Sequence, residues 1–286
     1  MSLSVLMPVY AKESPVFLRE SLESLAAQTR PADEVVIVED GPLGEPLRAV
    51  VAAFGKVLPI VSLPLPGHVG LGAALRAGVY GCRGEFIARM DADDISVASR
   101  FQRQMDFLES NRDVDVVGSA IAEFDEHCSA PRSVRMPPAS GEALRRFARS
   151  RTPFNHMTVV FRRASVVAAG NYESCPGFED YHLWARMLTL GYRLHNMNDI
   201  LVYARCGSQM QSRRGGLAYL QQEIRFQTFL RTMGLQDAPG AFSGILLRGP
   251  IRLAPSPVRA LCYNLFLRER LPSAAVPANR RQPGRG

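Results

Sequence analysis

Residues 84–94 read GEFIARMDADD, an apolar run that ends in three carboxylates. Similar apolar runs, read as buried strands, occur earlier at 4–9 (SVLMPV), 34–38 (EVVIV) and 57–63 (VLPIVSL). Helical patterns separate the runs, and the first begins after Ser14 and Pro15, an N-cap followed by a first-turn proline. This alternation predicts an α/β fold with a mostly parallel, Rossmann-like sheet, helices on both faces, and ligands beyond the carboxyl ends of the strands.

Acidic residues follow two of the predicted strands. Glu39 and Asp40 directly precede a glycine, a pattern that a plain turn explains as well as a ligand site does. Asp91, Asp93 and Asp94 repel one another unless a cation is present. A hard divalent ion, Mg²⁺ or Mn²⁺, fits this group, because one or two carboxylates plus substrate phosphates commonly hold it.

A structural explanation for the second acidic group is also open. Residues 94–99 precede a helical pattern carrying Phe101, Met105 and Leu108, and carboxylates are favoured at helix N-termini. For Asp94 this explanation is the preferred one.

The composition excludes several classes of protein. The chain has 286 residues, 47% hydrophobic and 21% charged, as in ordinary globular domains and unlike disordered or collagen-like chains. Five scattered cysteines, without a Cys-x-x-Cys spacing, predict neither a zinc site nor a disulfide framework. The longest apolar stretch, 242–267, is interrupted by arginines and prolines, so we expect no membrane-spanning helix.

Positive charge is concentrated at the C-terminal end of the chain. The net charge is +7, and residues 244–286 carry eight arginines and a single acid, Glu269. The preceding chain is close to neutral and contains no recognisable nucleic-acid docking motif, so we expect no nucleic-acid partner. An anionic membrane surface is the partner that this charge distribution favours.

Four segments occur in a characteristic order: 4–10 (SVLMPVY), 38–41 (VEDG), 70–78 (GLGAALRAG) and 91–94 (DADD). Together they resemble family 2 glycosyltransferases of the GT-A fold, such as those of bacterial exopolysaccharide, capsule and O-antigen synthesis. Further matching segments are 155–161 (NHMTVVF), 169–172 (AGNY) and 179–184 (EDYHLW). The resemblance covers residues 3–206 and implies a GT-A fold, the nucleotide-diphospho-sugar transferase fold.

The resemblance also implies a donor site for a nucleotide-diphospho-sugar, most simply a UDP-sugar. The positions that match the family's donor-binding residues are Pro8 and Tyr10 beside the base, Glu39 or Asp40 bonded to it, Asp91 at the ribose or sugar, and Asp93 on the metal. Glu39 replaces the usual first aspartate and His68 stands where asparagine is frequent, so which of the two acids contacts the base stays open. Arg76 is assigned to the donor pocket, with an exposed helical arginine as the equal alternative.

For catalysis, the resemblance implies that Asp180 is the general base of an inverting transfer, with Glu179 beside it near the acceptor. Without the resemblance, both acids are explained as first-turn residues of a helix carrying Leu183 and Trp184. His156 matches a position near the acceptor and diphosphate, where it either donates to a phosphate oxygen or is structural.

The remaining chain is divided into 207–271, an acceptor-side loop with C-terminal helices, and 272–286, a disordered basic tail; the catalytic domain is 1–206. Arg213 and Arg214 lie in the loop, where they either bind the diphosphate or are exposed. A helix over 217–233 is expected to dock through Leu220, Ile224, Phe226 and Leu230. An amphipathic helix over 255–271 either lies at the membrane interface or packs on the body.

We therefore expect an inverting, metal-dependent glycosyltransferase that acts on a hydroxyl of a glycan or lipid-linked acceptor in cell-surface polysaccharide synthesis. The expected location is the cytoplasm, peripheral at the inner face of the plasma membrane. One alternative is a sugar-nucleotide nucleotidyltransferase, but residues 10–13 (YAKE) lack the glycine-rich loop it needs. The other is a non-catalytic interaction protein of the same fold, against which the intact Asp91, Asp93 and Asp180 argue.

Overall fold

The computed structural model describes residues 1–206, 216–254 and 269–270. Its strands are β1 (Leu3–Tyr10), β2 (Glu34–Asp40), β3 (Ile60–Pro64), β4 (Phe86–Arg89), β5 (Ile95–Ser96), β6 (Val116–Phe124), β7 (Ser133–Arg135), β8 (Val160–Arg162), β9 (Leu194–Arg205) and β10 (Glu269–Arg270). Its helices are α1 (Pro15–Ala26), α2 (Glu45–Phe54), α3 (Leu71–Gly81), α4 (Arg100–Ser110), α5 (Gly141–Phe147), η1 (His156–Thr158), α6 (Arg163–Ala168), α7 (Glu179–Thr189), α9 (Leu217–Thr232) and α10 (Ala238–Leu253).

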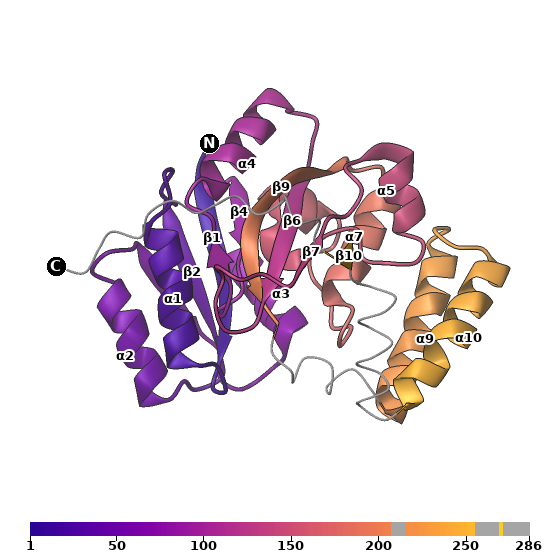
Figure 1. Cartoon of the computed structure of the whole chain (residues 1–286), viewed down its shortest axis with the longest axis horizontal. Coiled ribbons are helices and arrows are strands. Elements are labelled where there is room, and N and C mark those ends of the chain that lie inside the picture. The colour runs from indigo at the N-terminus through magenta and orange to yellow at the C-terminus, as the bar shows by residue number, and fades with distance from the viewer. Residues whose placement is uncertain (207–215, 255–268, 271–286) are drawn as a thin grey trace.

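The described strands form one sheet in the order β10-β7-β6-β8-β4-β1-β2-β3, with β9 paired to β6 and β5 paired to β9 (Figure 1). The predicted parallel half is confirmed, because β3, β2, β1 and β4 pair in parallel. The third strand begins at Ile60 rather than at 57, since residues 55–57 form a turn after α2. Beyond β4 the sheet is mixed: β8 is antiparallel to β4 and β6, whereas β6 and β9 form a long parallel ladder.

The sheet has a hydrophobic core on each face. Alternate residues of β1 point to opposite sides, so Leu6 packs in one core and Val5 in the other. The Leu6 core is covered by α3 and α7, and the Val5 core by α1, α2 and α4. Helices therefore cover both faces, as the alternation of apolar runs and helical patterns predicts.

Helix α3 lies unusually close to the sheet. A Cβ atom at Gly78 would lie 2.2 Å from Leu6 Cδ1 and 2.8 Å from Val38 Cγ2, so only glycine fits at this position. The close approach places the first turn of α3, after Gly70, at the sheet edge where β1 and β2 end.

The C-terminal helices are stacked on α7. Phe226 of α9 stacks on Phe178 at a centroid distance of 4.5 Å, and α10 packs against the other side of α9 (Figure 1). The prediction that Ile224 lies on the docking face of α9 is wrong, because its side chain is 40% exposed. Glu223 is buried there instead, because Arg248 of α10 pairs with its carboxylate at 3.0 Å.

Several expectations fall on the remaining residues. The loop with Arg213 and Arg214, residues 255–268 and the tail lie outside the described residues, so they and the proposed domain boundaries stay predictions. The helix expected over 255–271 is wrong at its end, because Glu269 and Arg270 form β10, antiparallel to β7. None of the helices in 1–206 and 216–254 has the length and apolar content needed to cross a bilayer.

Candidate active site

The carboxyl ends of β1, β2 and β4 meet at one edge of the sheet. Tyr10 pairs with Asp40 across the β1–β2 ladder, and the Met90 N–H donates to the Leu6 carbonyl at 3.0 Å. The acidic loop that begins at Asp91 therefore leaves the sheet beside β1. This arrangement confirms that the two acidic groups seen in the sequence share one edge.

The two acids after β2 have different partners. Asp40 is buried, and its carboxylate accepts the backbone N–H groups of Val69 (2.7 Å) and Gly70 (3.2 Å). His68 Nδ1 lies 2.8 Å from the same carboxylate. The half-buried Glu39 side chain has no hydrogen bond or ion pair with any described residue. Asp40 therefore organises the turn before α3, and Glu39 is the carboxylate available to a ligand.

An aromatic pair stands at the end of β1. The rings of Tyr10 and His68 are stacked, with centroids 6.1 Å apart and planes inclined by 29°. Pro8, two residues before Tyr10, is half-buried and on the same side of the strand. These three side chains border the sheet edge on which Glu39 lies.

The acidic loop brings three carboxylates together. Ligand oxygens of Asp91, Asp93 and Asp94 all lie within 4.8 Å of one another. Both carboxylate oxygens of Asp91 are bonded to the buried guanidinium of Arg89 at 2.5 Å. Asp94 is buried and accepts the backbone N–H of Arg205 at 2.8 Å.

The charges of this group are only partly compensated. Burial and the neighbouring Asp91 carboxylate raise the pKa of Asp93 to about 6. The same two causes raise the pKa of Asp94 well above its ordinary value. Asp94 Oδ2 is buried and has no hydrogen-bond partner within the described part of the chain. Hard oxygen donors with uncompensated charge fit Mg²⁺ or Mn²⁺. Asp93 is the main ligand candidate, because Arg89 pairs with Asp91 and the Arg205 N–H bonds to Asp94.

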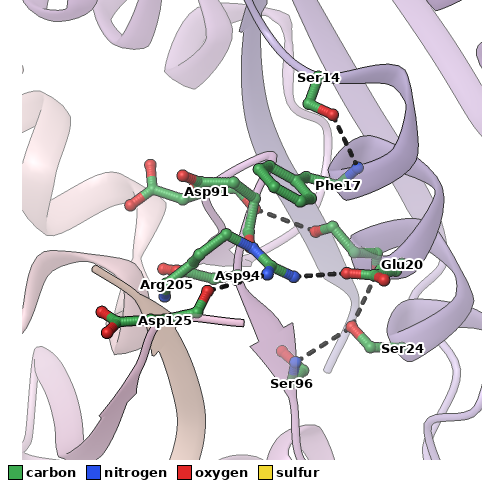
Figure 2. Close-up of polar contacts among 11 residues, drawn as sticks. Ser14, Phe17, Glu20, Ser24, Asp91, Asp94, Ser96, Asp125 and Arg205 are labelled. Atoms are coloured by element: carbon green, nitrogen blue, oxygen red, sulfur yellow. Dashed lines mark hydrogen bonds and ion pairs between the residues drawn. The ribbon is translucent and has the colours of Figure 1, made fainter. Parts of the chain in front are cut away.

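Arg205, the last residue of β9, is hydrogen-bonded to the acidic loop (Figure 2). Its Nε donates to the Asp93 carbonyl at 3.1 Å, and its Nη2 pairs with the Glu20 carboxylate of α1. The guanidinium lies over the rings of Phe17 and Phe124, at 3.9 and 4.6 Å from their centroids. Its Nη1 donates to the Asp125 carbonyl at 3.4 Å, so all three nitrogens are engaged. A cation held by three nitrogens and two aromatic rings is a rigid support for the metal-ligand candidate.

Helix α1 supports the loop through serines as well. Ser21 Oγ donates to the Asp91 carbonyl at 3.0 Å, and Ser24 Oγ accepts the Ser96 N–H at 3.0 Å. Figure 2 shows α1 side chains on one side of the loop and Arg205 on the other. The loop is therefore fixed by contacts to its backbone, and no described side chain is hydrogen-bonded to or paired with the Asp93 carboxylate.

Replacing Arg205 with leucine is expected to weaken Mn²⁺ binding about 10–100-fold, the usual effect of removing a group that positions a metal ligand. Calorimetric titration of Mn²⁺ measures this effect. The matched control is Arg103→Leu, which removes a surface ion pair with Asp199 and should leave Mn²⁺ affinity unchanged. An unchanged affinity in Arg205→Leu would contradict the positioning role.

The first turn of α7 contains the acids expected near the acceptor. Asp180 is half-buried, and its Oδ2 accepts the hydroxyl of Thr152 at 3.1 Å. Burial raises the pKa of Glu179, whose Cγ lies 2.9 Å from where a Cβ at Gly72 would stand. The first turns of α3 and α7 therefore touch. The structural explanation of both acids as first-turn residues is confirmed, and it is compatible with a catalytic role for Asp180.

His156 is part of an aromatic group next to the acidic loop. Its Nε2 lies 2.9 Å from Tyr172 Oη, and its ring meets Trp184 edge-on at 6.2 Å. Burial, followed by the charge of Arg89, lowers the pKa of His156 well below its ordinary value. The imidazole is thus neutral, with one N–H to donate. Trp184 is fully buried and belongs to the core.

Arg76 does not contact the acidic loop. Its Nη1 donates to the carbonyls of Gly170 and Tyr172 at 3.1 and 3.0 Å. These bonds tie α3 to the turn before α7. Arg76 therefore has a structural role, and its assignment to the donor pocket stays a prediction.

Two arginines of the site were missed by the sequence reasoning. Arg89 stands two positions before Asp91, on an otherwise apolar strand, and Arg205 ends the apolar stretch of β9. A buried strand position occupied by arginine indicates a paired charge, because an unpaired one is costly to bury. That signal identifies the need for a partner but not which carboxylate supplies it.

The structure resembles solved glycosyltransferases of the GT-A fold. TarS of S. aureus in complex with UDP-GlcNAc aligns with a TM-score of 0.68 and 20% identity, over 93% of this chain and 76% of that one. The mannosyltransferase PcManGT of Pyrobaculum calidifontis in complex with GDP-Man and Mn²⁺ aligns at 0.60 and 18%, over 92% and 79%. The curled α/β sheet with an acidic loop at its carboxyl edge is thus a GT-A fold.

The sequence model of glycosyl transferase family 2 matches residues 4–169, and the chain belongs to this family. It is 41% identical to the amylovoran biosynthesis glycosyltransferase AmsE of Erwinia amylovora, over 91% of this chain and 97% of the relative. It is 32% identical to an Escherichia coli UDP-Gal:alpha-D-GlcNAc-diphosphoundecaprenol beta-1,3-galactosyltransferase, over 93% and 96%. The protein is a glycosyltransferase.

Proposed function

We propose that this protein transfers a sugar, with inversion, from a UDP-sugar to a hydroxyl of a lipid-linked glycan in cell-surface polysaccharide synthesis. The observation that carries the proposal is the group Asp91, Asp93 and Asp94, with oxygens within 4.8 Å of one another at the edge where β1 and β2 end. The names of the two relatives support the pathway and the lipid-linked acceptor. The UDP complex of the structural neighbour is consistent with a UDP donor.

On the donor side, Glu39 accepts the uracil N–H, and Pro8 and Tyr10 flank the base. Asp91, held by Arg89, faces the ribose or the sugar. Asp93 would hold Mg²⁺ or Mn²⁺, which would supply Lewis-acid stabilisation of the negative charge that develops on the leaving diphosphate. The contacts of Asp40 with the turn before α3 keep Glu39 at the edge of the sheet.

On the acceptor side, Asp180 removes the proton of the attacking hydroxyl. The acceptor oxygen forms its bond to the anomeric carbon as the bond to the diphosphate oxygen breaks, so UDP leaves and the configuration inverts. Thr152 orients the Asp180 carboxylate by donating to Oδ2. A membrane-borne acceptor places the enzyme at the cytoplasmic face of an anionic membrane, and Arg213 and Arg214 are proposed to contact the diphosphate.

The proposal is tested first by calorimetric titration of UDP, GDP and dTDP, with and without Mn²⁺. UDP is expected to bind more tightly when Mn²⁺ is present. Failure of all three nucleotides to bind under any metal condition would refute the donor site. Incubation of UDP-sugars with lipid-linked acceptors then separates transfer from binding by a non-catalytic protein.

The Glu39→Gln variant tests the base contact. The amide oxygen can still accept the uracil N–H, but the negative charge that strengthens this hydrogen bond is lost, so UDP affinity should fall by about 1–2 kcal/mol. That loss corresponds to roughly 5–30-fold in Kd. The control is Glu45→Gln on α2, whose exposed carboxylate pairs only with Arg48. Equal UDP affinity in Glu39→Gln and the native protein would show that the uracil does not contact Glu39.

A further inference from the structure

The outward side of α10 carries large apolar side chains. Phe242, Leu246, Leu247 and Leu253 are 68, 62, 71 and 53% exposed. Among the residues of this helix whose side chains the structure describes, the exposed ones are uncharged: Ala238, Pro239, Phe242, Ser243, Leu246, Leu247, Pro250 and Leu253. A helix that faces water normally presents charged residues there, as α9 does with Arg225 and Arg231.

The inward side of α10 contains two glycines at its contact with α9, besides Arg248, which pairs with Glu223. A Cβ at Gly244 would lie 2.9 Å from Gln227 Oε1, and one at Gly249 would lie 3.5 Å from Leu220 Cδ1. Small residues thus let α10 approach α9 closely, and the large apolar residues face away from the protein. We call Phe242, Leu246, Leu247 and Leu253 the α10 outer face. An exposed apolar patch of this kind marks an interaction site.

We propose that the α10 outer face docks into the interface of an anionic lipid bilayer. Charge complementarity selects this partner, because the chain has no acidic residue between Asp237 and Glu269 and carries eight arginines from 244 to 286. Two copies of the chain would bring these like charges together, whereas anionic headgroups neutralise them. Arginines beside an apolar helix face are the composition of an interfacial helix.

The position of the helix suits a membrane-borne acceptor. Figure 1 shows α9 and α10 as the outer layer at one end of the molecule, with α2 at the other end. Helix α9 lies on α7 through the Phe178–Phe226 stack, and α7 carries Asp180. One helix layer thus separates the docking face from the helix of the proposed base. The purpose of docking, delivery of a lipid-linked acceptor, rests on the proposed function; the docking itself does not.

Vesicle flotation of the full chain tests the proposal. One set of vesicles is phosphatidylcholine alone, and the other is phosphatidylcholine mixed with phosphatidylglycerol. The native protein is expected to float with the second set, and Phe242→Glu/Leu246→Glu should lower its partition about tenfold or more, because apolar burial is replaced by two anionic groups. The matched control is Val57→Glu/Leu190→Glu, which changes residues of 68 and 61% exposure elsewhere on the surface.

Circular dichroism melting and UDP titration accompany each variant, and both should be unchanged because the substituted residues are exposed. The proposal is overturned if the native protein does not float, if the control loses partition equally, or if the α10 variant floats like the native protein. Dissociation of a dimer by the α10 variant without a change in flotation would assign the face to a second copy and also overturn it. If the native protein floats with the anionic vesicles but does not bind UDP, the donor site is refuted and the docking proposal still holds.

Discussion

Asp180→Asn is expected to lower kcat by about 10²–10⁴-fold, the usual contribution of a general base. The amide still accepts the Thr152 hydroxyl at the position of Oδ2, so the first turn of α7 should be preserved. It does not take a proton from the acceptor hydroxyl, which is a weak nucleophile without deprotonation. Steady-state kinetics with a UDP-sugar and a lipid-linked acceptor measure the loss, and the Kd for UDP should be unchanged.

The neighbouring Glu179→Gln variant is the control, since it removes a carboxylate from the same helical turn. We expect a smaller effect, because the Glu179 side chain packs against the first turn of α3 at Gly72. An inactive Glu179→Gln beside an active Asp180→Asn would transfer the role of base to Glu179. Loss of UDP binding in Asp180→Asn would indicate a structural role.

Asp93→Asn is expected to remove the metal-dependent part of UDP binding. Asp91 is paired with the Arg89 guanidinium, and one oxygen of the buried Asp94 accepts the Arg205 N–H. Asp93 is the less buried of the two carboxylates that no arginine pairs with in the described residues, so we expect it to be the main ligand. Loss of the metal's contribution should cost several kcal/mol in transition-state stabilisation, at least about 100-fold in kcat/KM. Titration of UDP with and without Mn²⁺, and kinetics at saturating Mn²⁺, measure the two effects.

Two further variants test whether the effect of Asp93→Asn comes from loss of a metal ligand or only from loss of a negative charge. Asp113→Asn removes an exposed carboxylate paired with Arg193 and should leave the metal dependence unchanged. Asp94→Asn keeps an acceptor for the Arg205 N–H, so its effect should be smaller than that of Asp93→Asn. If Asp94→Asn lost the metal dependence and Asp93→Asn retained it, Asp94 would be the ligand.

Part of the site was predictable because it is local in sequence. The acidic residues directly follow apolar runs, and parallel strands place their carboxyl ends at one edge. Asp180 was predictable as a first-turn residue of α7, because it directly precedes the apolar residues that define the helix. The bonds from Arg76 to the carbonyls of Gly170 and Tyr172 could not be predicted, because a helical position does not reveal partners that are distant in the chain. The place of Arg76 in the donor pocket stays a prediction.

The sequence by itself determined the parallel half of the sheet, the two acidic groups at its edge and the family resemblance, since apolar periodicity and short motifs are read from neighbouring residues. Only the tertiary structure decided that Asp40 is committed to the turn before α3 and Glu39 is free, that Arg89 holds Asp91, and that the large residues of α10 face outward. It also brought Arg205 to Glu20, across 185 positions of chain. A buried charge needs a partner close in space, and that partner can be distant in the chain. The role of such a side chain therefore depends on contacts that only the folded structure shows.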